Sequence, residues 1–235
     1  GAGETVAVVD SGFTHGHTEM DGKTINGYGS YNSDQHGQHV AGIAVAGYDS
    51  NNVNFNSAWS GTYGNLTYGM HGVAYDANLH ITSYNNGSSG TGYPTNWASA
   101  TDSASGATVQ NNSWGFDQQY GGADIDVVKT YMDNNGLNGS QTLVAYQSID
   151  SDSDGIYDVG SSSSIKTWTT NNWDTYITSL NNFQNNGVIV FALSNDNSRS
   201  DSDISAGLPV LFPQLAEAWI TVANVNITGT GTQSF

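Results

Sequence analysis

Cysteine is absent from the chain, and basic residues are nearly absent. The 235 residues include 4 Lys and Arg against 21 Asp and Glu, which gives a formal net charge of −17. Binding to nucleic acid or to an anionic membrane surface depends on clustered Lys and Arg, so the composition argues against both. The lack of cysteine neither requires nor excludes an oxidising compartment.

Long apolar segments are missing as well. No run approaches the ~20 apolar residues that a transmembrane helix needs, and the sequence opens with neither a signal peptide nor a Met. Periodic apolar segments are nevertheless too frequent for a disordered chain, and the length suffices for one domain with a sizeable core. Abundant Gly, Ser, Asn and Thr with scarce Lys favour a bacterial protein that is secreted or displayed on the cell surface.

Residues 4–12 carry the first pattern with chemical content. An apolar run, Val6 to Val9, ends in Asp10 and a Ser-Gly turn. Such a run is typical of a buried parallel strand. Sites in open α/β sheets form at the carboxyl ends of the strands, so we expect Asp10 to lie at such an edge.

Residues 35–47 predict a tightly packed helix that begins with a histidine. Small side chains allow a neighbouring backbone to approach, while Val40, Ile43 and Val45 form an apolar stripe at helical spacing. His36 at the start of this helix can take and return a proton near neutral pH. It needs a group that fixes its tautomer, and Asp10 is the candidate for that role.

These two stretches resemble the subtilisin-like serine proteases, or subtilases. The family pattern is an Asp-Ser-Gly strand end followed by His-Gly-Thr-His-Val-Ala-Gly, and here residues 36–42 read His-Gly-Gln-His-Val-Ala-Gly. Residues 70–74 (Met-His-Gly-Val-Ala) and 111–115 (Asn-Asn-Ser-Trp-Gly) are most similar to the protease passengers of bacterial autotransporters. The resemblance implies an α/β fold with a mostly parallel central sheet flanked by helices on both faces.

The resemblance also implies roles for individual residues. Asp10 would orient His36, His36 would act as general base, and Asn195 would donate its amide to the oxyanion. The substrate, a peptide or protein, would add as a strand to one exposed loop and contact two further segments. These substrate-binding residues would be Gly87, Ser88, Ser89, Gly90, Ser113, Trp114, Gly115, Ala192, Leu193 and Ser194. Gln38 and Ser194 depart from the family, which has Thr and Gly at these places.

The nucleophile of the family is not found. A subtilase serine lies in a Gly-Thr-Ser segment that begins a buried helix, and the 235 residues contain no such segment. We therefore expect one catalytic domain, 1–235, that is incomplete at its carboxyl end, with the nucleophile beyond Phe235. The alternatives are a non-catalytic surface, adhesin or assembly module on the same scaffold and, on composition alone, a calcium-dependent carbohydrate binder.

An acidic segment predicts a calcium site. Asp150, Asp152, Asp154 and Asp158 alternate around a glycine, like the opening of an EF-hand loop. Ser161 stands where the bidentate Glu of that loop would be, so a complete EF-hand is not expected. The alternative is a solvated acidic loop. The segment lies in residues 116–172, which we interpret as an insertion, and the oligomeric state is left open.

Further elements follow from hydrophobic periodicity. Strands are expected within residues 24–28, 70–81, 108–115, 187–196 and 219–225, and helices within 97–105, 124–134 and 173–186. A Ser/Asn/Gly-rich stretch, for which no element is predicted, lies between the last two helices.

Overall fold

A computed structural model gives the fold. It describes residues 1–13, 20, 22–29, 35–47, 71–84, 95–115, 124–147, 173–193 and 201–223. Six strands form one sheet in the order β2-β3-β1-β4-β5-β6, and every neighbouring pair is parallel. The strands are β1 (Thr5–Asp10), β2 (Ile25–Tyr28), β3 (Asn78–Ser83), β4 (Val109–Asn112), β5 (Val188–Ala192) and β6 (Trp219–Val222).

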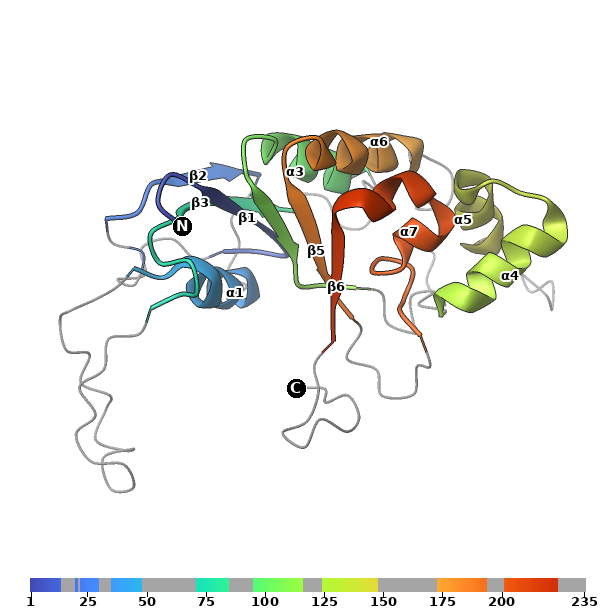
Figure 1. The fold of residues 1–235 in the computed structure, drawn as a ribbon, viewed down its shortest axis with the longest axis horizontal. Coiled ribbons are helices and arrows are strands. Elements are labelled where there is room, and N and C mark those ends of the chain that lie inside the picture. The colour runs from blue at the N-terminus through green and yellow to red at the C-terminus, as the bar shows by residue number, and fades with distance from the viewer. Residues whose placement is uncertain are drawn as a thin grey trace, which may run out of the picture.

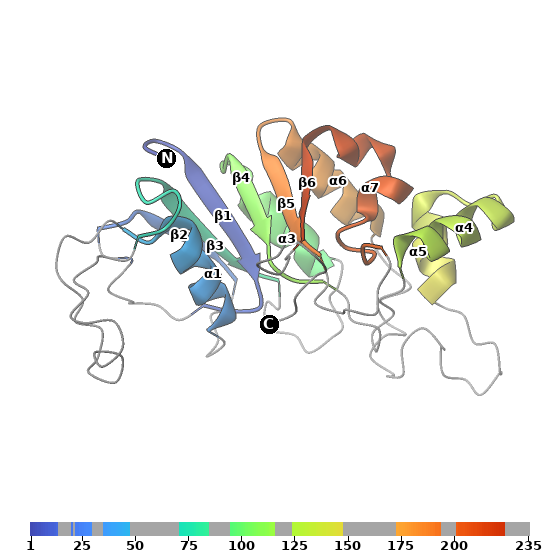
Figure 2. The same ribbon diagram turned by 60° about the horizontal axis from the view of Figure 1, so that its bottom comes forward.

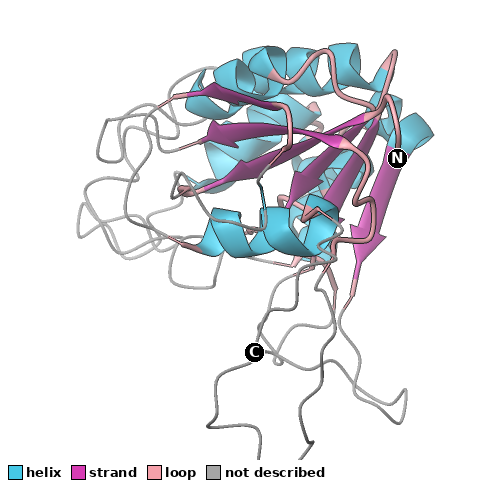
Figure 3. Cartoon of the chain, turned by 90° about the vertical axis from the view of Figure 1, so that its left-hand side faces the viewer, coloured by secondary structure: helices cyan, strands magenta, loops and turns pink. Residues whose placement is uncertain are grey.

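Helices cover both faces of this sheet. The helices of the described residues are α1 (His36–Val45), α3 (Thr95–Ser103), α4 (Ile125–Asn135), α5 (Gly139–Gln147), α6 (Trp173–Gln184), α7 (Leu208–Leu211) and the 3₁₀ helix η4 (Pro213–Ala218), of which α4 and α5 lie beyond the sheet (Figure 1). Helix α1 lies on one face, and α3 and α6 pack together on the other (Figures 1 and 2). Figure 3 shows the strands between these helical layers. The predicted α/β class is therefore confirmed.

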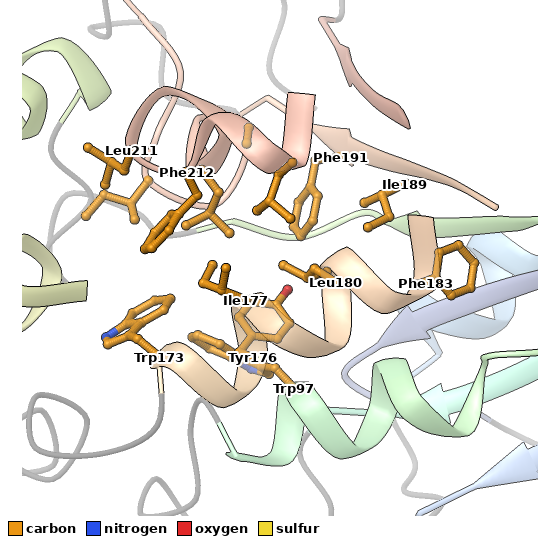
Figure 4. Packing of buried hydrophobic residues seen from close by; sticks show 14 of the residues in the cluster. Trp97, Trp173, Tyr176, Ile177, Leu180, Phe183, Ile189, Phe191, Leu211 and Phe212 are labelled. Carbon is orange, nitrogen blue, oxygen red and sulfur yellow. The ribbon is translucent and has the colours of Figure 1, made fainter. Parts of the chain in front are cut away.

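The face covered by α3 and α6 holds the larger core. Its buried side chains are mainly aromatic or branched and include Tyr176, Leu180, Ile189 and Phe191, each at most 2% exposed (Figure 4). Helix α6 forms because its apolar residues recur at helical spacing, so that one side of it is buried throughout. Burying such side chains is the main stabilising term of the fold.

The face covered by α1 holds a smaller core. Val8, Leu79 and Ile81 of the sheet pack against Ala41 and Val45 of α1. The small residues of the helix allow this close packing, as the sequence predicted. Ile43 departs from the predicted apolar stripe, because it is 58% exposed.

Helix α5 lies in the Ser/Asn/Gly-rich stretch between 134 and 173, where the sequence predicted no element. Gln141 N–H donates to Asn138 Oδ1 (2.9 Å) and Asn138 N–H donates to Gln141 Oε1 (3.0 Å), which is a capping box. Leu143 is fully buried and ties the helix to the core. The Asn-x-x-Gln spacing is a sequence signal that could have predicted this helix.

None of the helices in the described part of the chain is both long and apolar enough to cross a lipid bilayer.

Candidate active site

Asp10 ends β1 at the point where the order of the strands reverses. Strands β2 and β3 lie to one side of β1, and β4 to β6 lie to the other. In parallel sheets this is where the strand ends leave a crevice. The Asp10 side chain is 1% exposed, and its Oδ1 accepts hydrogen bonds from Ser11 N–H (2.7 Å) and Ser11 Oγ–H (3.2 Å). The carboxylate is therefore held in one orientation.

His36 meets this carboxylate as the sequence predicted. It is the first residue of α1, and its Nδ1 lies 2.8 Å from Asp10 Oδ1. The side chain of His36 is 53% exposed, whereas that of Asp10 is 1% exposed. The pair thus joins a fixed, buried carboxylate to an imidazole that reaches solvent. With Nδ1–H donated to Asp10, Nε2 is left as the acceptor of a proton.

Gly37 permits this contact by bringing α1 close to the end of β1. A Cβ at Gly37 would lie 2.3 Å from the carbonyl oxygen of Gly12 and 2.9 Å from Cβ of Asp10. No side chain fits in that space, so any other residue would push α1 away. The glycine after the histidine is therefore part of the geometry that joins His36 to Asp10.

Burial and hydrogen bonding act on Asp10 in opposite directions. Burial raises the pKa of the carboxyl above its ordinary value, while the hydrogen bond and charge of His36 and the two donors of Ser11 lower it. Within the described residues, the buried Asp10 Oδ2 has no hydrogen-bond donor. The ionised carboxylate therefore depends on His36 and Ser11 for its stabilisation.

The described residues of the predicted substrate cleft lie at the same edge of the sheet. Ser113, Trp114 and Gly115 directly follow β4, while Ala192 ends β5 and Leu193 follows it. The register aligns Asn112 of β4 with both Val9 of β1 and Phe191 of β5. Residues 113–115 therefore follow the strand next to β1, and Ala192 and Leu193 lie one strand further along, all at the same carboxyl edge of the sheet as Asp10.

The other predicted site residues lie outside the described residues. They are the predicted substrate-binding residues Gly87, Ser88, Ser89, Gly90 and Ser194, the predicted oxyanion donor Asn195, and the predicted calcium ligands Asp150, Asp152, Asp154 and Asp158. Within the parts of the chain that the structure describes, no group of three or more His, Cys, Asp or Glu side chains could hold a metal ion.

Sequence reasoning missed two contacts that support Asp10. The indole N–H of Trp114 donates to the carbonyl oxygen of Val9 (3.1 Å), and Tyr84 N–H donates to that of Asp10 (3.1 Å). Tyr84 directly follows β3 and is next to the partner of Asp10 in the register, so its backbone contact could have been predicted once β1 and β3 were paired. No sequence signal predicts the contact made by the indole.

A family model described as the subtilase family matches residues 1–234. The chain belongs to the subtilase family. The extracellular serine protease of Serratia marcescens is 29% identical over 244 residues, which cover 96% of this chain and 20% of the relative. The chain thus spans about a fifth of the length of this curated relative.

Solved structures agree with the subtilase fold. The prenylagaramide maturation protease PagA matches with a TM-score of 0.55 and 17% identity, covering 98% of this chain and 57% of that one. MycP1 with its N-terminal propeptide removed matches with a TM-score of 0.52 and 16% identity, covering 98% and 60% of the two chains. At these identities the likeness shows the fold alone.

Proposed function

We propose that this chain is the acid–base half of a secreted serine endopeptidase of the subtilase type. The observation that carries the proposal is the 2.8 Å contact between His36 Nδ1 and Asp10 Oδ1 at the carboxyl edge of a parallel sheet. Family membership supports the reaction class, and the extracellular relative from Serratia marcescens supports secretion. The autotransporter-like segments at residues 70–74 and 111–115 agree with export to the cell surface.

The proposed reaction is peptide-bond hydrolysis by acyl transfer. Nε2 of His36 takes the proton of a serine hydroxyl as that oxygen attacks the scissile carbonyl, and then returns the proton to the leaving amine. Asp10 holds the imidazole in the required tautomer and stabilises the imidazolium. Asn195 and a backbone N–H are proposed to hold the oxyanion. The proposal requires the full-length protein to supply the nucleophile, because the 235 residues contain no Gly-Thr-Ser segment.

Substrate binding is proposed to use the main chain of a peptide or protein. Gly87 to Gly90 would pair with the substrate as an added strand, which reads the backbone and suits broad specificity. Ser113 to Gly115 and Ala192 to Ser194 would flank the residue next to the scissile bond. Ser113 and Trp114 follow β4, which pairs with β1, and Ala192 ends β5, which pairs with β4. Their place at the carboxyl ends of these strands supports this arrangement.

A serine-directed fluorophosphonate probe tests the proposed activity. The full-length protein is expected to label, and His36→Ala is expected to abolish labelling while the circular dichroism spectrum stays native. Gln38→Thr, which restores the family residue next to the site, serves as the matched control and is expected to label. A native spectrum without labelling of the wild-type protein would instead support a non-catalytic surface or assembly module.

We also propose that Asp150, Asp152, Asp154 and Asp158 bind a structural calcium ion. Their alternation around a glycine supports this, because four carboxylates so close together would otherwise repel one another. Titration calorimetry with calcium is expected to give binding heat that Asp152→Ala weakens. The absence of heat at millimolar calcium would identify a solvated acidic loop.

A further inference from the structure

Trp114 is connected to the strand that carries Asp10 by a side-chain hydrogen bond. Its indole Nε1–H donates to the carbonyl oxygen of Val9 at 3.1 Å, one residue before Asp10 and 105 residues away in the sequence. An indole has one donor and no acceptor, so this bond uses its whole polar capacity. The half-buried ring thus fixes the peptide that leads into the carboxylate.

Tyr84 holds the next peptide of the same strand. Its N–H donates to the carbonyl oxygen of Asp10 (3.1 Å), and its ring packs on that of Trp114 with centroids 5.0 Å apart. The two carbonyl groups on either side of the Asp10 Cα are therefore held by two aromatic residues that touch each other. We call Tyr84 and Trp114 the aromatic clasp.

The clasp is anchored in the large core. The Trp114 ring also lies 5.3 Å from that of Trp97 in α3 and 5.2 Å from that of Phe191 in β5. Trp97 is 4% exposed and Phe191 is fully buried. Close-packed interiors resist small displacements, so the clasp transmits the rigidity of this core to the end of β1.

We propose that Trp114 is a positioning residue, which holds the backbone of Asp10 so that its carboxylate stays aligned with His36. The expected effect of Trp114 on turnover rests on the proposed function. Its expected effect on the Asp10–His36 contact does not. Trp114 acts through the backbone of β1. Losing the indole donor should therefore slow the chemical step more than it weakens substrate binding.

Trp114→Phe is the test, and Trp219→Phe is a matched control. Both changes keep an aromatic ring and remove one indole-to-carbonyl hydrogen bond of 3.1 Å, but the acceptor of Trp219 is Ala206, far from Asp10 in the sheet. In the full-length protein, kcat and KM are measured with a peptide substrate. Exchange of the His36 Nδ1 proton with water is measured by NMR in parallel.

Trp114→Phe is expected to lower kcat about tenfold while KM stays within about twofold of the wild-type value. It is also expected to speed exchange of the His36 Nδ1 proton about tenfold. Both tenfold effects are of the size expected for the loss of one hydrogen bond. Trp219→Phe is expected to change each quantity by less than about twofold. Equal behaviour of the two variants would overturn the proposal. A wild-type protein without turnover would contradict the proposed function alone, because the exchange measurement still tests the clasp.

Tyr84→Leu provides a second variant should Trp114→Phe fail to fold. It removes the ring that packs on Trp114 but keeps the N–H that donates to Asp10. Nδ1 exchange is expected to become faster than in the wild-type protein, by less than in Trp114→Phe. An unchanged exchange rate in folded Tyr84→Leu would contradict a role for the clasp.

Discussion

The two faces of the sheet are built from different side chains and perform different tasks. The face under α3 and α6 is filled by large residues such as Tyr176, Leu180 and Phe191, all at most 2% exposed. The face under α1 is thinner, with Ala41 and Val45 on the helix. Large apolar side chains contribute the most burial energy, so stability is concentrated on the first face.

The thinner face buries less apolar surface and positions His36, while the aromatic clasp on the other face positions Asp10. Gly37 brings the start of α1 within contact distance of Gly12 and Asp10, and the imidazole of His36 remains 53% exposed. A helix covered by bulky side chains could not come so close to the strand end. Substitutions on the two faces can separate these two tasks.

His36→Ala is expected to have the largest effect on function. Turnover should fall by about 10⁶-fold, the size of loss that removal of the histidine causes in subtilisin, a member of this family. The free energy of unfolding should fall by no more than about 1.5–3 kcal/mol, the value of one charged hydrogen bond. Steady-state kinetics measures turnover, and urea unfolding measures stability. If His36→Ala loses activity because it unfolds, the separation of function from stability is contradicted.

Leu180→Ala and Leu79→Ala compare the two faces with the same chemical change. Leu180 of α6 is fully buried and Leu79 of β3 is 2% exposed, so each variant should lose about 2–5 kcal/mol of stability. Leu79 packs in the core under α1, so its loss should also lower kcat of the folded protein. Leu180→Ala should lower kcat less than Leu79→Ala does. Equal kcat values at a temperature where both are folded would contradict the division of tasks.

The strand ends and the central pair were predictable because their signals are local. A buried parallel strand is an apolar run, and Asp10 and His36 each lie at the end of a periodic segment. The same reasoning predicted α6 correctly, because its apolar residues recur along the whole helix.

Other features depend on contacts that no local pattern contains. The Trp114–Val9 hydrogen bond joins residues 105 positions apart, and the space around Gly37 is defined by Gly12 and Phe13. Helix α5 was not predicted for another reason. Its Gly and Ser residues have low helix propensity, which the cap between Asn138 and Gln141 and the burial of Leu143 outweigh.

Gly37→Ala tests the close approach on the thin face. The new Cβ would lie 2.3 Å from the Gly12 carbonyl oxygen, so α1 must shift. A displacement of about 1 Å can cost about 10²-fold in rate. Gly42→Ala in the same helix is the matched control, because nothing lies within 4 Å of its Cβ position. It should keep full activity and gain about 0.4–1 kcal/mol of stability. A fully active Gly37→Ala would show that the approach is not needed.

Asp10→Asn is expected to have the smallest effect on stability, and the effect depends on pH. Burial raises the pKa of Asp10 in the folded protein, so its contribution to stability is fully present below the ordinary carboxyl pKa and is lost as the pH rises through the raised pKa. Asparagine does not titrate. The variant should therefore gain stability relative to the wild type between acidic and neutral pH, as measured by urea unfolding. If the difference in free energy of unfolding between Asp10→Asn and the wild type stays constant or shrinks as the pH rises, His36 and Ser11 lower the pKa of Asp10 by more than burial raises it. The ionised Asp10 would then not destabilise the fold.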